Sequence, residues 1–143
     1  MLYLSGYLVR HRDDYYRLLR AVTADGAWEE WVIFMARAVE ESARSALQLV
    51  TTVIGQRDRI EASIRESHPT FHAAELARIL TRQPYARIED VVAAGLAQRQ
   101  TASRWLTALA DDGLIDRQKV GRNVVFINSE LLAALFDTDL VGR

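Results

Sequence analysis

Apolar residues recur at helical spacing through the first half of the chain. From Tyr3 to Thr23 they come every three or four residues, which predicts a helix. After Gly26 a second amphipathic pattern runs from Ala27 to Ile64 and predicts one long helix, with a bend expected near Gly55. Because a helix rises about 1.5 Å per residue, this one would extend over roughly 55 Å. Other elements must therefore pack against it.

Short helices follow a proline-containing turn at Ser67–Thr70, where we place a domain boundary. Helices are predicted over His72–Thr81 and Ile88–Ala94, with Gln83–Tyr85 as the turn between them. Gly95 stands directly after the second of these helices. Glycine at that position favours a left-handed backbone, which ends one helix and lets the next begin in a new direction.

A third short helix is predicted over Ala97–Asp111, because its apolar residues form one stripe suited to burial. Two strand-like segments follow it, Leu114–Val120 and Val124–Ile127. They predict strands joined by a tight turn at Gly121–Asn123, which makes the segment a β-hairpin.

A final helix is expected over Glu130–Phe136, with Ser129 as its N-cap. The complete pattern predicts a mainly α fold in two domains. Residues 1–67 would form an N-terminal helical bundle with one long helix. Residues 70–143 would form a winged helix-turn-helix domain, because a small β-hairpin directly after a helix-turn-helix is a wing.

The helix over Ala97–Asp111 would be the recognition helix, which lies in the major groove when such a domain binds DNA. Arg99 and Gln100 near its start suit bidentate hydrogen bonds to guanine and adenine, respectively. Polar residues farther along the helix and on the wing suit phosphate contacts. The candidate DNA-binding residues are Arg99, Gln100, Thr101, Ser103, Arg104, Thr107, Arg117, Lys119 and Arg122. Duplex DNA is therefore the expected partner.

The charge of the chain gives evidence both for and against DNA binding. Its formal net charge is -1, whereas DNA-binding domains usually carry a basic surface. Between Leu96 and Asn123, however, the basic residues outnumber the acids, which cluster around one helix end. Winged helices also serve as protein-interaction or dimerisation modules, so the near-neutral charge keeps that use open as an alternative.

Composition excludes several classes of function. The chain has no cysteine, so disulfides, thiol catalysis and cysteine-ligated zinc are excluded. No apolar run approaches the ~20 residues of a membrane span, so we expect a cytoplasmic protein without membrane contact. The histidines stand singly, and the acidic pairs are adjacent residues that suit solvated helix faces. We therefore expect no metal site, no cofactor and no catalytic residue.

The order of residues in the first half is informative: Leu2-Tyr3-Leu4-Ser5, Tyr7, Arg12, Tyr15-Tyr16, Leu18-Leu19, Gly26, Trp28-Glu29 and Trp31. This series resembles the segment that follows the catalytic loop in Fic-family proteins. A second series resembles the winged-helix tail that many of those proteins carry: Pro84-Tyr85, Arg99-Gln100-Thr101-Ala102, Leu106, Leu109, Gly113-Leu114 and Gly121-Arg122. The resemblance covers nearly the whole chain.

Fic-family proteins typically transfer AMP from ATP to hydroxyl side chains, with a histidine base and an anion-binding loop of the pattern HPFxxGNGRxxR. That pattern is absent, and His68-Pro69 is only a superficial echo of it. In the family the loop would lie just upstream of Leu2. The resemblance implies a DNA-binding regulatory module of a Fic-family protein, without catalytic activity of its own. The alternative is a protein-interaction or dimerisation module serving a Fic-type AMP transferase encoded upstream or separately.

An aromatic stripe on the first two predicted helices suggests a further contact. It consists of Tyr15, Tyr16, Trp28, Trp31, Phe34 and Met35. In an intact relative these residues would pack partly against the catalytic core, and exposed they would form a large apolar patch. We expect homodimerisation, or docking of a separately encoded Fic catalytic domain, to bury the stripe. The alternative is that the helices fold back on one another and bury it within one chain.

Overall fold

Two compact units make up the chain. The computed structural model describes residues 4–121 and 123–140 of the 143, the last four by their backbone alone. The N-terminal unit comprises Met1–Thr51 with Leu135–Arg143, and the C-terminal unit comprises Thr52–Ala134. Each unit has its own hydrophobic cluster.

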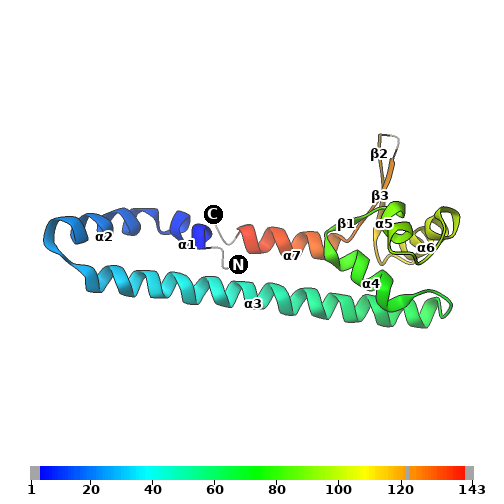
Figure 1. Ribbon diagram of the computed structural model, residues 1–143, viewed down its shortest axis with the longest axis horizontal. Helices are drawn as coiled ribbons and strands as arrows, with labels where there is room; N and C mark the ends of the chain where they lie inside the picture. Colours follow the sequence, from blue (N-terminus) through cyan, green and yellow to red (C-terminus); the bar gives the residue numbers. More distant parts are fainter. Residues whose placement is uncertain (1–3, 122, 141–143) are drawn as a thin grey trace. The chain divides into compact units, whose positions relative to one another are not determined.

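Most of the described residues are helical, and the strands form one small antiparallel sheet, so the expected mainly α fold with a β-hairpin is confirmed. In chain order the elements of Figure 1 are α1 (Leu4–Arg10), α2 (Arg12–Asp25), α3 (Trp28–Ser67), α4 (Ala73–Arg82), β1 (Tyr85–Ala86), α5 (Ile88–Ala93), α6 (Arg99–Asp111), β2 (Asp116–Val120), β3 (Asn123–Ile127) and α7 (Ser129–Leu140). Helix α3 continues through Gly55 without interruption.

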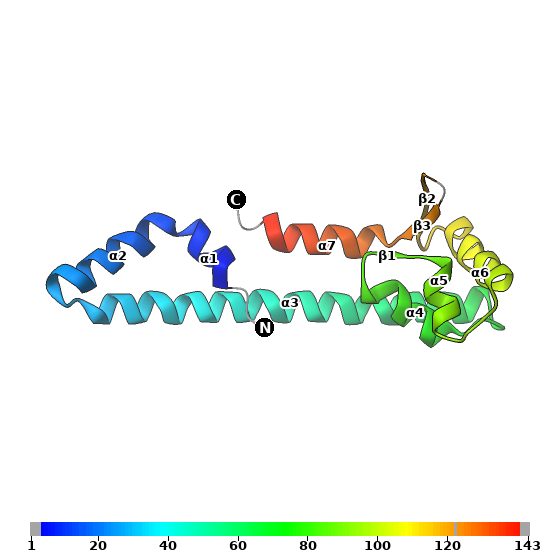
Figure 2. The ribbon, with the colours of Figure 1, turned by 45° about the horizontal axis from the view of Figure 1, so that its top comes forward.

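The N-terminal unit is a helical hairpin. Helix α2 turns back along the first half of α3 (Figures 1 and 2). Its buried cluster takes Tyr7 from α1, Leu18 from α2, and Phe34 and Ala38 from α3. Burial of these side chains holds the two arms of the hairpin together.

A break at His11 divides the helix that was predicted from Tyr3 to Thr23. His11 has φ -109° and ψ 36°, outside the helical range, and its ring centroid lies 4.3 Å from that of Tyr7. Its backbone N–H still donates to the Tyr7 carbonyl, and its carbonyl accepts from the Tyr15 N–H. The chain therefore changes direction here without leaving those groups unpaired, and neither glycine nor proline marks the position.

The C-terminal unit is built around one cluster of apolar side chains. Helix α3 reaches into this unit and contributes Ile60 and Ile64, which were expected to belong to the other domain. The remaining members come from α4, α5, α6 and the strand region, and include Leu76, Leu80, Val91, Trp105, Leu106, Leu109, Ile115 and Phe126. Fully burying a residue of this size contributes roughly 1.5 to 3 kcal/mol each.

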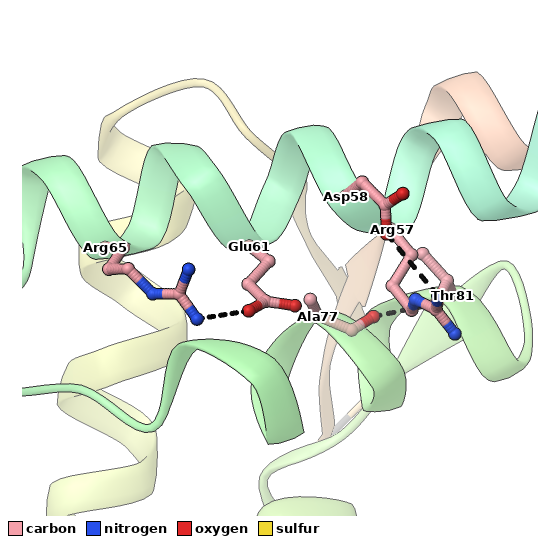
Figure 3. Close-up of polar contacts among 6 residues, drawn as sticks. All are labelled: Arg57, Asp58, Glu61, Arg65, Ala77 and Thr81. Carbon is pink, nitrogen blue, oxygen red and sulfur yellow. Dashed lines mark hydrogen bonds and ion pairs between the residues drawn. The ribbon is translucent and has the colours of Figure 1, made fainter.

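The compact C-terminal unit begins inside α3, whereas the domain boundary was expected at Ser67–Thr70. Figure 3 shows the end of α3 lying over α4. On α3, Arg57 pairs with Asp58 at 3.4 Å and Arg65 pairs with Glu61. Because the end of α3 supplies core residues, the turn after it connects two packed helices of one unit.

The sheet of the C-terminal unit has the order β1-β3-β2. Strand β1, which was assigned to a turn, pairs with β3 through Tyr85 opposite Ile127 and Ala86 opposite Phe126. Ala86 and Phe126 are both buried, so a two-residue strand is stabilised by packing as well as by its ladder. Because β1 has only two residues and its partner is distant in the sequence, no pattern of apolar and polar residues predicts the strand.

Asn128, and not Ser129, caps α7. The Leu131 N–H donates to Asn128 Oδ1 at 3.0 Å, and the Ser129 hydroxyl donates instead to Asp116. The side-chain NH₂ group of Asn128 donates to the Leu80 carbonyl, in the last turn of α4, at 3.1 Å. One buried amide thus satisfies groups at two helix ends.

Among the helices of the described residues, none combines the length and the apolar character that crossing a bilayer requires. Helix α3 has the length, but charged residues interrupt its apolar stretches.

Gly95 and Gly55 allow one substitution to be tested in two backbones. Gly95 has φ 72°, and a Cβ at either glycine meets nothing within 4 Å. Gly95→Ala should therefore lower the free energy of unfolding by about 1 kcal/mol through backbone strain alone. Gly55→Ala, inside α3, should raise it by about 0.5 to 1 kcal/mol. Urea unfolding followed by circular dichroism measures both, and shifts of the same sign would contradict the prediction.

Candidate nucleic-acid interface

A five-residue turn between α5 and α6 sets the direction of α6. At the start of α5 the Arg87 N–H donates to the Asp90 carboxylate at 2.7 Å. At its end the Gly95 and Leu96 N–H groups donate to the Val92 and Val91 carbonyls. The left-handed backbone of Gly95 then reverses the chain, as the sequence predicted. Backbone hydrogen bonds therefore hold this turn in one conformation.

Helix α6 has one buried and one outward face. Its buried residues are Ala102, Trp105, Leu106 and Leu109. At about 100° per residue, the opposite side of the helix carries Gln100, Ser103, Arg104 and Thr107, whereas Arg99, the first residue, lies on the side of Ala102 and Leu106. Both arginines and the glutamine are exposed, while the serine and threonine are half-buried. Four of the candidate DNA-binding residues thus share the outward side, Thr101 lies at its half-buried edge, and Arg99 is exposed at the start of the helix.

Arg99 is engaged by an acid that the sequence analysis did not identify. Its guanidinium donates to Glu89 Oε1 of α5 at 2.6 Å, and both side chains are largely exposed. A hydrogen bond from its own backbone amide, and then the one from Arg99, lower the pKa of Glu89 from its ordinary 4.5. Only the α5–α6 turn brings these residues together, so spacing along the chain gave no signal of the pair.

Strands β2 and β3 form a hairpin that projects beyond the helices of its unit (Figures 1 and 2). Arg117 lies opposite Phe126 and Lys119 lies opposite Val124. Because side chains alternate along a strand, the two cations share the face of the buried Phe126. Both are exposed on β2. Arg122, the candidate at the tip, lies outside the described residues.

Most acids near this surface already have partners. The pairs are Glu89 with Arg99, Asp90 with the Arg87 backbone, Asp112 with His68 at 2.6 Å, and Asp116 with Ser129. By contrast, no ion pair within the described part of the chain engages Arg104, Arg117 or Lys119. The cations of α6 and β2 are therefore available to an anionic ligand, although exposed Asp111 offsets part of their charge.

The aromatic stripe belongs to the N-terminal unit. Phe34 is buried, and Tyr15, Trp31 and Met35 are half-buried against it. The Tyr15 and Trp31 ring centroids lie 5.2 Å apart. Much of the stripe thus packs inside one chain, while Tyr16 and Trp28 remain exposed.

Within the described residues, no three histidine, cysteine or carboxylate side chains come close enough together to hold a metal ion. The three histidines have separate surroundings. The His11 ring is tilted against that of Tyr7, His68 stacks on Phe71 at 4.4 Å, and the His72 ring centroid lies 5.7 Å from that of Trp105.

Replacing Arg99 should change the titration of Glu89. The pKa of Glu89 is lowered in the folded chain, so the pairing is present at neutral pH and is lost as the pH falls through that pKa. Arg99→Ala removes the second cause, so the pKa should rise toward 4.5 without reaching it. Carboxyl chemical shifts measured by NMR across pH test this. Arg104→Ala is the control, and an equal rise in that variant would contradict the pairing.

The sequence of the C-terminal unit matches a known family. Residues 57–131 match the family described as the C-terminal domain of SoFic-like protein adenylyltransferases. The matched segment is more than half of the 143-residue chain and lies within the C-terminal unit, Thr52–Ala134. It includes α4, α5, α6 and the β2–β3 hairpin. The chain therefore belongs to the SoFic-like protein adenylyltransferase C-terminal domain family.

Proposed function

We propose that the C-terminal unit is a winged helix-turn-helix domain that binds duplex DNA, as a cytoplasmic regulatory module of a Fic-related adenylyltransferase. The observation that carries the proposal is the outward polar face of α6, set by the α5–α6 turn and followed by a hairpin with unpaired cations. Family membership supports the link to an adenylyltransferase.

The order of elements supports a winged helix. Helix α4, strand β1, helices α5 and α6, and strands β2 and β3 follow one another, and β1 pairs with β3 at the inner side of the hairpin. In a helix-turn-helix protein the second helix of the motif enters the major groove. Here that helix is α6, because its buried face packs in the core and its polar face is free.

Base contacts would come from the start of α6. Gln100 is exposed and has the donor and acceptor that match adenine. Arg99 must leave Glu89 to reach a guanine. Because this ion pair is exposed, water and salt screen it, so breaking it costs little compared with the two hydrogen bonds that an arginine can donate to guanine. The exchange therefore favours DNA, and Glu89 holds Arg99 at the surface until DNA arrives.

Phosphate contacts would come from the remaining cations and hydroxyls. Arg104 and the half-buried Ser103 and Thr107 lie on the same face of α6. Arg117 and Lys119 extend the basic surface along β2, on one face of the hairpin. Each phosphate that a cation neutralises releases counterions, so binding should weaken as salt increases.

Removing one phosphate-contacting cation should weaken binding to all sequences equally. Lys119→Ala and Arg104→Ala should each reduce the slope of log affinity against log salt by about 1. Fluorescence anisotropy with random and selected duplexes, at salt concentrations of about 50 and about 200 mM, measures this slope. Arg20→Ala removes the same charge from an exposed arginine of α2, which belongs to the N-terminal unit and is not part of the proposed interface. Its slope should equal that of the wild type.

The absence of binding at low salt would contradict the DNA proposal. An equal reduction of the salt slope in Arg20→Ala and Lys119→Ala would also contradict it, because the slope would then depend only on the net charge of the chain.

We also propose that this chain does not transfer AMP by itself. Its sequence lacks the pattern HPFxxGNGRxxR, and nothing in the described residues substitutes for a phosphate-binding glycine loop beside a histidine base. Incubation with ATP and candidate protein substrates should give no AMP adducts by mass spectrometry, with an intact Fic enzyme as the positive control. Adducts formed by the purified chain would contradict this proposal.

A second candidate is a protein-interaction module for the catalytic part of an adenylyltransferase. The overall charge of -1 favours it, because electrostatic attraction to DNA is then confined to one surface. The same titration separates the two candidates. A module that contacts only protein would show no salt-dependent binding to any duplex.

A further inference from the structure

Helix α3 is apolar on two opposite faces within the N-terminal unit. Phe34 and Ala38 lie on the face that packs against α1 and α2. Ala43 is nine residues from Phe34, which places it about 180° around the helix. The exposed large residues of α3 gather near that second face. In this unit they are Trp28 (62% exposed), Val32 (58%), Ile33 (46%), Val39 (44%), Leu47 (67%) and Val50 (54%).

The spacing of this second face is that of a coiled-coil seam. We call the α3 stripe the residues Val32, Ala36, Val39, Ala43, Ala46 and Val50, which follow one another at alternating intervals of four and three. All six are exposed. A seam of this period favours left-handed packing against a second helix. Its alanines would allow the two helices to approach closely.

The α3 stripe is complementary to itself when reversed. With two helices antiparallel about a two-fold axis at Glu41, Val32 lies opposite Val50 of the second copy. In the same arrangement Ala36 meets Ala46 and Val39 meets Ala43. These pairs place large residues together at the ends and a small residue in each inner layer. The match is a property of one chain, so it favours an isologous pair.

The edges of the stripe select the antiparallel direction. Ile33 and Leu47 both lie on one edge, and antiparallel packing sets this edge against the same edge of the second copy. Leu47 then faces Ile33. Parallel packing would set this edge against the other one, which carries Trp28, Met35, Ser42 and Leu49, and would bring Leu47 beside Ser42. Leu47 therefore finds a large apolar neighbour across the seam only in the antiparallel pair.

The charge at the rim is compatible with this arrangement. Glu40 would lie near its counterpart beside the two-fold axis. Within its own helix it pairs with Arg44 at 2.8 Å, and Arg37 lies one turn before it on the same side. Each glutamate therefore approaches the other with cations on both sides. At an exposed rim the remaining repulsion is screened by water and salt.

We propose that a second copy of this chain covers the α3 stripe, forming an antiparallel two-helix seam. The seam from Val32 to Val50 is about 27 Å long at 1.5 Å per residue. It lies on the side of α3 away from α1 and α2, so it differs from the aromatic stripe. The pairing goes beyond DNA binding and does not depend on it.

Light scattering on the full chain at micromolar concentration, without DNA, tests the pairing. The wild type should have twice the 16.2 kDa mass of one chain. Val39→Glu should weaken association by at least about 100-fold, because it places charges in the seam. Val9→Glu is the matched control on α1, where the valine is 67% exposed, and it should remain paired. Circular dichroism should show the same helix content in both variants.

Crosslinking tests the direction, because the chain has no cysteine of its own. Val32→Cys mixed with Val50→Cys should give a mixed disulfide-linked dimer, while neither variant alone should crosslink efficiently. A wild type of single-chain mass would overturn the proposal, and so would a folded Val39→Glu variant that stays paired. Crosslinking of Val32→Cys to itself would overturn the antiparallel arrangement.

Discussion

Burial of one apolar cluster determines how the C-terminal unit presents its surface. Leu106 and Leu109 of α6 pack with Leu76 of α4 and with Phe126 of β3, and Ile64 of α3 closes the same cluster. Because α6 has only one apolar face, this packing fixes which of its residues point outward. The polar face proposed to meet DNA is therefore a consequence of core packing, and its chemistry could change without disturbing the fold.

Periodicity and turn chemistry predicted most of the elements, because both are local. Helix α6 and the hairpin follow from residue spacing, and Gly95 marks the turn as expected. Features that depend on distant residues were missed. Strand β1 exists only through its pairing with β3, and Asn128 became a cap because its amide also reaches Leu80.

The candidate interface shows the same limit. Its residues could be chosen from the sequence because an amphipathic helix separates polar from buried positions. The sequence could not show that Arg99 is held by Glu89, since the pairing depends on the angle between two helices. The sequence also predicted that the aromatic residues of the first helices would be the exposed apolar surface. In the structure α2 folds back and covers much of the aromatic stripe, while the aliphatic residues on the opposite face of α3 stay uncovered.

The two hydrogen bonds of the Asn128 side chain link segments that are far apart in the chain. The amide joins the end of α4 to the start of α7, and its own backbone N–H donates to the Pro84 carbonyl at 2.9 Å. Any local opening that releases Asn128 therefore frees the connection before β1 and the first turn of α7 together. The Leu131 amide, which donates to Asn128, would then exchange its hydrogen when both segments open together. Its exchange rate would therefore measure how cooperatively the C-terminal unit opens.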